Sequence, residues 1–431
     1  MSTIAQKSLE TFAMRVAAQL VAAGGAIVIA RTLLTTGKGE FTYAGTILAF
    51  ALMATVGHNK AVLWQYGRRG LPSAAVIRVM ILVVIAISAP LILAMVLLGH
   101  LISSQQSLFF VAVALPFAMF SQSAMGIFLG DGDVRRANIV GMIPPVAAAL
   151  VYVPLILFVH RSLTVVLAIW AASYVLGGIY TMLALRRYRR EPAAVDLKAL
   201  AKEQLTFGSQ ACLSSLLQYL DFRIGVFLVM FMMGSAALGV YSVGIGIGEF
   251  IWQLSSAMIN PALKDIGGQD YERAIEVTGK CMRHSLVLVF AAAVLVAIVA
   301  RPLVPLIYGP AFAYGAVVTI ALLPGIVAYS MMPALAAFFL QQLGQPRLPF
   351  YFSALSAAVS GVVTALALPH FGIIAAAVAT SFSYSIAFIA AAVYFVRRTG
   401  TGLGKIFALS TDDLRPYYVL LTSAVAVLRG R

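Results

Sequence analysis

Three ionisable residues lie inside long apolar stretches of this chain. Asp221 and Arg223 lie near the middle of an apolar run over 207–233, and Glu249 lies near the middle of the next run, over 236–259. An ionised side chain at the centre of a membrane helix costs about 2.5 to 3.5 kcal/mol on insertion scales. These residues therefore indicate a path for an ion or a polar substrate.

Further polar residues recur at helical spacing around them. They form four groups, one on each of four predicted spans. The first is Gln210, Ser214, Gln218, Asp221 and Gly225, and the second is Ser242, Glu249, Gln253, Ser256 and Asn260. The third is Thr11, Arg15 and Gln19, and the fourth is Thr55, His58, Asn59 and Lys60. Polar stripes on membrane helices face protein or water rather than lipid. For Ser and Gln, hydrogen bonding between helices and lining of a cavity both stay open. For Asp221 and Glu249 we favour the cavity, because an unneeded carboxylate is costly there.

The composition sets the class of protein that holds these stripes. Of 431 residues, 61% are apolar and 10% are charged, and the mean hydropathy is +0.96. So little polar surface cannot cover a soluble globule, and apolar runs long enough to span a bilayer recur along the chain. We predict an all-α polytopic membrane protein with twelve spans, at 12–35, 42–66, 76–99, 106–129, 138–159, 163–185, 207–233, 236–259, 284–308, 312–341, 348–369 and 372–396.

Both ends of the chain carry additional expectations. The first 15 residues show no cleavage-site pattern and run into a full span, so we interpret them as the start of that helix. The last apolar stretch, 417–428, is too short to span and is expected to be interfacial or packed on the bundle.

Basic residues predict the orientation. Most of the 30 Lys and Arg fall into loops on one side, including the cluster Arg186, Arg187, Arg189 and Arg190. The opposite side receives only Arg31, Lys38, Arg161 and Arg301. Since cytoplasmic loops retain positive charge, both termini are expected in the cytoplasm. The net charge of +15 is thus an orientation signal that also attracts anionic lipids, and it gives no reason to propose nucleic acid as a partner.

Internal repeats predict two similar halves. The stretches FLGDGDVRR, from Phe128, and FLQQLGQPR, from Phe339, each precede two apolar spans that end in a basic pair, and Gly39 and Gly239 open the second span of each half at an offset of 200. We predict two pseudo-symmetric six-helix bundles, 1–190 and 207–398, around a central cleft, with a basic cytoplasmic linker at 191–206 and a tail at 399–431. An even number of spans per half makes the repeats parallel.

No spacing indicates a cofactor or a catalytic centre. The two cysteines, Cys212 and Cys281, suggest neither a disulfide nor a metal framework, and we expect no metal and no cofactor. Asp131 and Asp133 sit in a glycine turn that we interpret as solvated. The sequence therefore does not predict an enzyme.

The order of several motifs resembles a known family. Asp221 precedes an apolar run, Leu238-Gly239-Val240-Tyr241 follows, and then come Glu249 and Pro261. This pattern is similar to bacterial polysaccharide-repeat flippases of the multidrug/oligosaccharidyl-lipid/polysaccharide exporter superfamily. The stretches PLVPLIYGPAF, LLPG, QLGQPR and PHFGIIAAAVATSFSY resemble its C-terminal half. The opening IARTLLTTGKGEFTYAG resembles its first loop, although threonines replace the usual Leu-Gly-Pro turn.

The resemblance implies movement of a polyprenyl-diphosphate-linked oligosaccharide from the inner to the outer leaflet of a bacterial inner membrane. Cations for the diphosphate are Arg15, Lys60, Arg223, Arg31 and Arg301; polar groups for the sugar are Gln19, Asn59, Gln210, Ser214, Gln218, Gln253 and Asn260; ion-coupling candidates are Asp221, Glu249 and His58. Membrane lipids and polysaccharide polymerase machinery are the further expected partners. Alternating access would move one half against the other.

Three alternatives stay open. A peptidoglycan-precursor flippase shares the fold and the cationic cavity, but usually has two further spans. A cation-coupled multidrug exporter would need a mostly anionic, aromatic cavity. A membrane polysaccharide polymerase or glycosyltransferase is the alternative from a different class, but it needs a long outward loop, and every outward loop predicted here is short.

Overall fold

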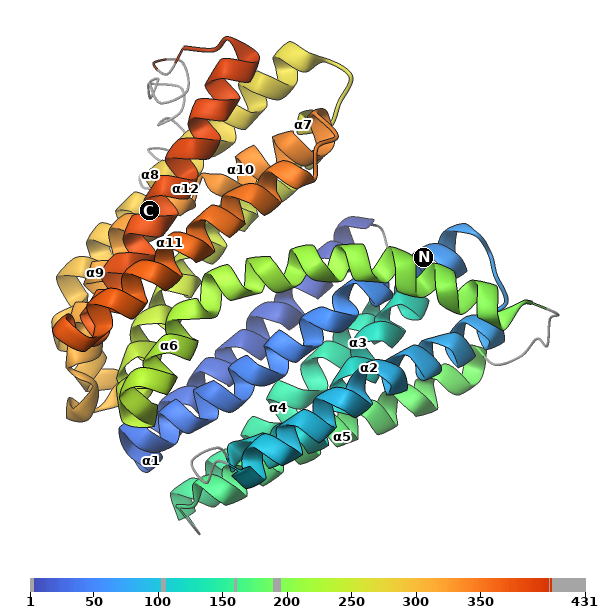
Figure 1. The fold of residues 1–431 in the computed structure, drawn as a ribbon, viewed down its shortest axis with the longest axis horizontal. Coiled ribbons are helices and arrows are strands. Elements are labelled where there is room, and N and C mark those ends of the chain that lie inside the picture. Colours follow the sequence, from blue (N-terminus) through green and yellow to red (C-terminus); the bar gives the residue numbers. More distant parts are fainter. Residues whose placement is uncertain (1–3, 102–105, 159–160, 189–194, 403, 405–431) are drawn as a thin grey trace, which may run out of the picture. The chain divides into compact units, whose positions relative to one another are not determined.

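The computed structural model describes residues 4–101, 106–158, 161–188, 195–402 and 404, and within these residues every regular element is helical. The helices are α1 (Ile4–Leu63), η1 (Trp64–Arg68), α2 (Ser73–Leu101), α3 (Ser107–Gly130), α4 (Val134–Phe158), α5 (Leu163–Leu185), η3 (Arg186–Tyr188), α6 (Leu197–Ile259), η4 (Asn260–Ala262), α7 (Leu263–Ile266), α8 (Tyr271–Tyr308), η5 (Pro310–Phe312), α9 (Tyr314–Tyr329), α10 (Met332–Ala337), η6 (Phe338–Gln342), α11 (Arg347–Phe371) and α12 (Ile373–Thr399). Figure 1 shows their arrangement. The predicted 417–428 segment lies outside the described residues.

Ten of the described helical stretches are long and apolar enough to cross a membrane. Two of them, Ala17–Arg68 and Ser215–Ser255, each cover a pair of predicted spans, and the other eight match one predicted span each. The all-α polytopic fold is therefore confirmed. The expected turns between the paired spans are replaced by single points at which a long helix changes direction.

Those two points are equivalent in the sequence. In α1 the backbone leaves helical geometry at Leu34, with φ 56° and ψ −162°, and in α6 it does so at Gly234, with φ 82° and ψ 179°. The two positions are separated by 200 residues, the offset seen in the sequence repeat. Leu34 is the only non-glycine residue with positive φ among those described, so it adopts a conformation that normally favours glycine.

The chain forms two compact units. Unit 1 holds residues 1–240 and 306–312, and unit 2 holds 241–305 and 313–431. The first limb of α6, before Gly234, thus belongs to unit 1 together with α1 to α5. The sequence halves and the packing units are different divisions of the chain, and the pseudo-symmetric halves stay a prediction.

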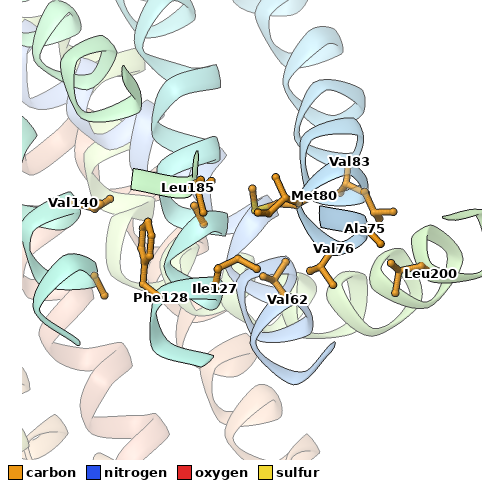
Figure 2. Packing of buried hydrophobic residues seen from close by; sticks show 14 residues of the cluster. Val62, Ala75, Val76, Met80, Val83, Ile127, Phe128, Val140, Leu185 and Leu200 are labelled. Atoms are coloured by element: carbon orange, nitrogen blue, oxygen red, sulfur yellow. The ribbon is translucent and has the colours of Figure 1, made fainter. Parts of the chain in front are cut away.

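A hydrophobic cluster at one end of unit 1 anchors α6. Val62 of α1, Met80 of α2, Phe128 of α3 and Leu200 of α6 are all buried in it, as Figure 2 shows. Leu200 lies in the predicted linker, which is helical from Leu197 onward. The buried Leu200 side chain in the first turn of α6 therefore packs the predicted linker against the helices of unit 1.

Unit 2 packs its helices through small residues. Ser381 of α12 donates a hydrogen bond to the carbonyl of Ala321 at 2.7 Å and accepts one from the backbone nitrogen of Gly325 at 2.9 Å, so α9 and α12 approach closely. The predicted span 312–341 is divided after Tyr329, where α9 ends and α10 begins with Pro333 in its first turn.

Candidate functional site

In unit 1, α1 and α6 cross at a pair of glycines, Gly39 and Gly239. A methyl group added to Gly39 would meet the carbonyl oxygen of Ser235, and one added to Gly239 would meet the carbonyl oxygen of Thr35. These two contacts are related by the same offset of 200 residues. Only glycine allows the backbones of α1 and α6 to approach this closely, so the crossing point is built into the sequence.

Halfway along the first limb of α6 lie the predicted charges. The Asp221 side chain is 1% exposed, and Arg223 is partly buried with its guanidinium carbon 5.9 Å from the centre of the Tyr219 ring. The Tyr219 hydroxyl donates a hydrogen bond to the carbonyl of Thr46 in α1 at 3.2 Å. A chain of contacts thus connects Arg223 through an aromatic ring to α1.

The C-terminal end of α1 holds a second group of polar residues, His58, Asn59 and Lys60. His58 is buried, and Gly208 of α6 lies so close to its imidazole that no side chain would fit between them. The Asn59 amide donates a hydrogen bond to the carbonyl of Gln122 in α3, so it joins two helices. Lys60, by contrast, is exposed. Of these three neighbours, Lys60 is the one available to a ligand.

Aromatic and charged contacts hold the first turns of α6 against η1, which directly follows α1. Arg69 forms an ion pair with Glu203 at 2.8 Å, and its guanidinium carbon lies 5.1 Å from the centre of the Trp64 ring. Trp64 in turn stacks on Phe207, with ring centroids 6.1 Å apart and planes 9° apart. These contacts position Lys60 and His58 by fixing α6 against α1.

Arg31 is engaged with protein. Its Nε donates a hydrogen bond to the carbonyl of Ile307 at 2.6 Å, and its Nη2 donates one to the carbonyl of Leu306. Both carbonyls belong to the last turn of α8, where helix carbonyls lack partners and favour a cation. Arg31 therefore caps the end of α8, although its side chain is exposed.

The other predicted site residues are divided between the two units, and some of them are only partly described. Glu249 is partly buried, and Gln253 and Arg301 are exposed. In unit 1, Gln19 and Gln218 are exposed. For Arg15, Gln210, Ser214 and Asn260 the side chains lie outside what the structure describes. Within unit 1, the structure thus distributes the predicted residues over both ends and the middle of α1 and α6.

The sequence reasoning missed Lys38, which it placed in an outward loop. Lys38 instead lies in the first turns of the α1 limb that follows Leu34, and only 9% of the residue is exposed. Its Nζ donates a hydrogen bond to the Thr42 hydroxyl at 3.3 Å. The repeat held the signal, because the equivalent residue 200 positions later is Leu238, which is fully buried.

Asp131 and Asp133 have local structural roles. The Asp131 carboxylate accepts hydrogen bonds from the hydroxyls of Tyr66, at 3.3 Å, and Tyr188, at 3.1 Å. Asp133 accepts a hydrogen bond from the backbone nitrogen of Arg136 and forms an ion pair with its guanidinium at 2.7 Å. This pair therefore holds the turn between α3 and α4 together.

Solved structures with the same fold are transporters and flippases. The chain is similar to the lipid II flippase MurJ in an inward closed conformation, with 12% identity, a TM-score of 0.71, and coverage of 96% of this chain and 93% of that one. It is also similar to an inward-facing multidrug resistance MATE family transporter of the MOP superfamily, with 15% identity, a TM-score of 0.69 and coverage of 88% and 94%. A MOP superfamily transporter from Pyrococcus furiosus matches with 15% identity, a TM-score of 0.61 and coverage of 90% and 92%.

The chain is thus a multi-pass helical membrane protein with the same fold as these flippases and transporters. No curated protein sequence matches the chain. Residues 72–316, more than half of the chain, match the polysaccharide biosynthesis protein family. The chain belongs to that family.

Proposed function

We propose that this protein moves a polyprenyl-diphosphate-linked oligosaccharide from the cytoplasmic to the outer leaflet, for the synthesis of a cell-surface polysaccharide. The family match over 72–316 is the observation that carries the proposal. A polysaccharide biosynthesis protein built from membrane-spanning helices is suited to a substrate that is itself held in the bilayer. Lipid-linked sugars are such substrates.

The charges of the site support this substrate. A diphosphate crossing hydrocarbon needs cationic partners, and Lys60 and Arg223 supply them on α1 and α6, with Arg15 as a further partner on α1. Arg31 and Arg301 belong to the same proposal, and Arg31 has to release the α8 carbonyls before it can bind a phosphate. The Gln and Asn residues of the stripes bind the sugar. Asp221, Glu249 and His58 couple the cycle to an ion.

The orientation is part of the proposal. Both termini lie on the cytoplasmic side of a bacterial inner membrane, because the basic clusters then face the cytoplasm. Two parallel halves rocking about the substrate site would give alternating access. Labelling of single cysteines at exposed Arg68 and Arg161 with a membrane-impermeant reagent tests the orientation: only the Arg161 position should react from outside in intact cells.

Leaflet-resolved transport in liposomes tests the function. A fluorescent polyprenyl-diphosphate oligosaccharide is placed in one leaflet, and its appearance in the other is followed by quenching. Arg223→Gln and Lys60→Gln should each slow transport at least about tenfold, the effect of losing one charge-assisted contact. Arg78→Gln is the matched control, since Arg78 is exposed on α2 and lies outside the proposed site. Absence of transport by the parent protein would reject the proposal.

A peptidoglycan-precursor flippase is the second candidate, favoured by the similarity to MurJ. The same liposomes loaded with lipid II in place of the oligosaccharide lipid distinguish the two. Faster transport of lipid II would favour this candidate. A multidrug exporter would instead move a cationic dye, and a polymerase would lengthen the sugar chain without moving it.

A further inference from the structure

Lys38 is a buried cation that the proposed transport path does not yet use. The residue is 9% exposed, and the Thr42 hydroxyl, 3.3 Å from its Nζ, is its hydrogen-bond partner. Among the described residues, no carboxylate forms an ion pair with it. Buried charges in proteins are normally paired, so an ammonium group without a counter-charge indicates that an anion belongs there.

Two helix starts converge in the backbone next to Lys38. The backbone is broken at Leu34 and at Gly234, so new helical limbs begin just before Lys38 and just before Gly239. The close contacts of Gly39 with Ser235 and of Gly239 with Thr35 bring these first turns together. A helix start carries roughly +0.5 of a unit charge and free N–H donors. Both starts and the lysine therefore bring N–H and ammonium donors to one place, while the limbs that end at Leu34 and Gly234 offset the charge of the two dipoles.

The acidic group nearest in the sequence is Glu40. Its carboxylate lies near the hydroxyls of Ser107 in α3 and Ser235 in α6. It forms no ion pair with Lys38 within the described part of the chain. The formal charges of Lys38 and Glu40 therefore cancel in number, but the two side chains are not paired with each other.

The repeat shows that packing alone does not require a lysine here. Leu238 occupies the equivalent place after the Gly234 break and is 0% exposed. A leucine thus satisfies the same position in the second crossing helix. The lysine adds a charge at the cost of desolvation, which points to a ligand rather than to packing.

We propose that Lys38, Thr42 and the two helix starts form a second diphosphate-binding station, at the end of the α1 limb opposite Lys60. The two lysines are 22 positions apart, which corresponds to about 33 Å of helix, close to the thickness of the hydrocarbon core. One helix thus carries a phosphate-binding cation near each membrane face. This inference rests on the proposed function: Lys60 receives the diphosphate, and Lys38 receives it after translocation, when the crossing opens.

Inorganic pyrophosphate is the probe for this station, because it carries the diphosphate chemistry without lipid or sugar. Thr36 is exposed, so a ¹⁹F label on Thr36→Cys reports locally, in a background with Cys212→Ser and Cys281→Ser. Pyrophosphate should shift the ¹⁹F signal saturably. Lys38→Gln should weaken the apparent affinity at least about tenfold, whereas Lys38→Arg should stay within about threefold, because it keeps the charge.

Two matched controls separate this station from general effects. Leu238→Met changes the equivalent position without adding or removing charge and should leave the ¹⁹F titration unchanged. Arg78→Gln removes an exposed cation of α2 outside the proposed site and should leave it unchanged as well. A titration that is non-saturable, or one in which Lys38→Gln binds as well as the parent, overturns the inference.

The proposed function fails or stands independently. The ¹⁹F titration needs no translocation and no lipid-linked sugar. If liposome transport fails while the Lys38-dependent shift persists, the substrate assignment is wrong and the anion site remains. If transport occurs with Lys38→Gln at the parent rate and the shift is absent, the station is wrong and the function remains. Melting curves of both Lys38 variants in the same detergent establish that they are folded.

Discussion

Gly39 and Gly239 lie at the point where α1 and α6 cross in unit 1: a methyl group added to Gly39 would be 2.9 Å from the backbone nitrogen of Gly239. The flanking contacts, Gly39 with Ser235 and Gly239 with Thr35, repeat at the offset of 200 residues. The two sequence repeats thus meet through a reciprocal contact. Figure 1 shows the course of α1 and α6.

Gly239→Ala should destabilise the protein. The added methyl meets the carbonyl oxygen of Thr35, which is backbone and cannot rotate away. Overpacking of this kind costs about 1 to 3 kcal/mol, so the unfolding midpoint in detergent should fall. Gly45→Ala is the control, because a methyl there meets nothing within 4 Å. Equal midpoints for the two variants would contradict the crossing.

Leu200→Ala should also lower stability, through a cavity. Leu200 is 3% exposed and fastens the start of α6 to the cluster in Figure 2. Loss of a buried leucine side chain costs about 2 to 5 kcal/mol. Leu205→Ala, in the same helix but 44% exposed, should change the unfolding free energy far less. A denaturant titration of both variants measures the difference, and a larger loss for Leu205→Ala would refute the anchoring role.

Arg31→Ala distinguishes a helix cap from a substrate contact. We expect a loss of about 1 kcal/mol in stability, at the low end for charged donors because Arg31 is exposed. Arg161 is an exposed arginine two residues before α5, and Arg161→Ala should leave stability unchanged. Thermal melting measures both. If Arg31→Ala melts like the parent protein while substrate affinity falls, its cationic role outweighs the cap on α8.

Asp221→Asn should separate transport from its driving ion gradient. Asp221 is 1% exposed in the middle of an apolar helix, and the amide keeps its size while removing the charge. We expect gradient-driven transport in liposomes to fall at least about tenfold with exchange at equilibrium retained. Glu272→Gln, at an exposed site on α8, is the control. Unchanged gradient dependence in Asp221→Asn, Glu249→Gln and His58→Gln together would remove the coupling hypothesis.

The sequence by itself determined the class of this protein. Its apolar runs predicted all-helical spans whose positions the structure confirms with small shifts, because hydropathy decides which segments leave water. The offset of 200 residues and the buried Asp221 were also legible, since repeats and misplaced charges are local features of a chain.

The tertiary structure decided what each polar residue does. Two predicted loops are breaks within long helices, at Leu34 and Gly234. Arg31 donates a hydrogen bond to a carbonyl of α8, and Asn59 donates one to the carbonyl of Gln122. The tertiary structure also buried Lys38, which the sequence placed in a loop. Helical periodicity gives the face of a residue, but the neighbour that meets this face comes from packing between segments as much as 276 residues apart.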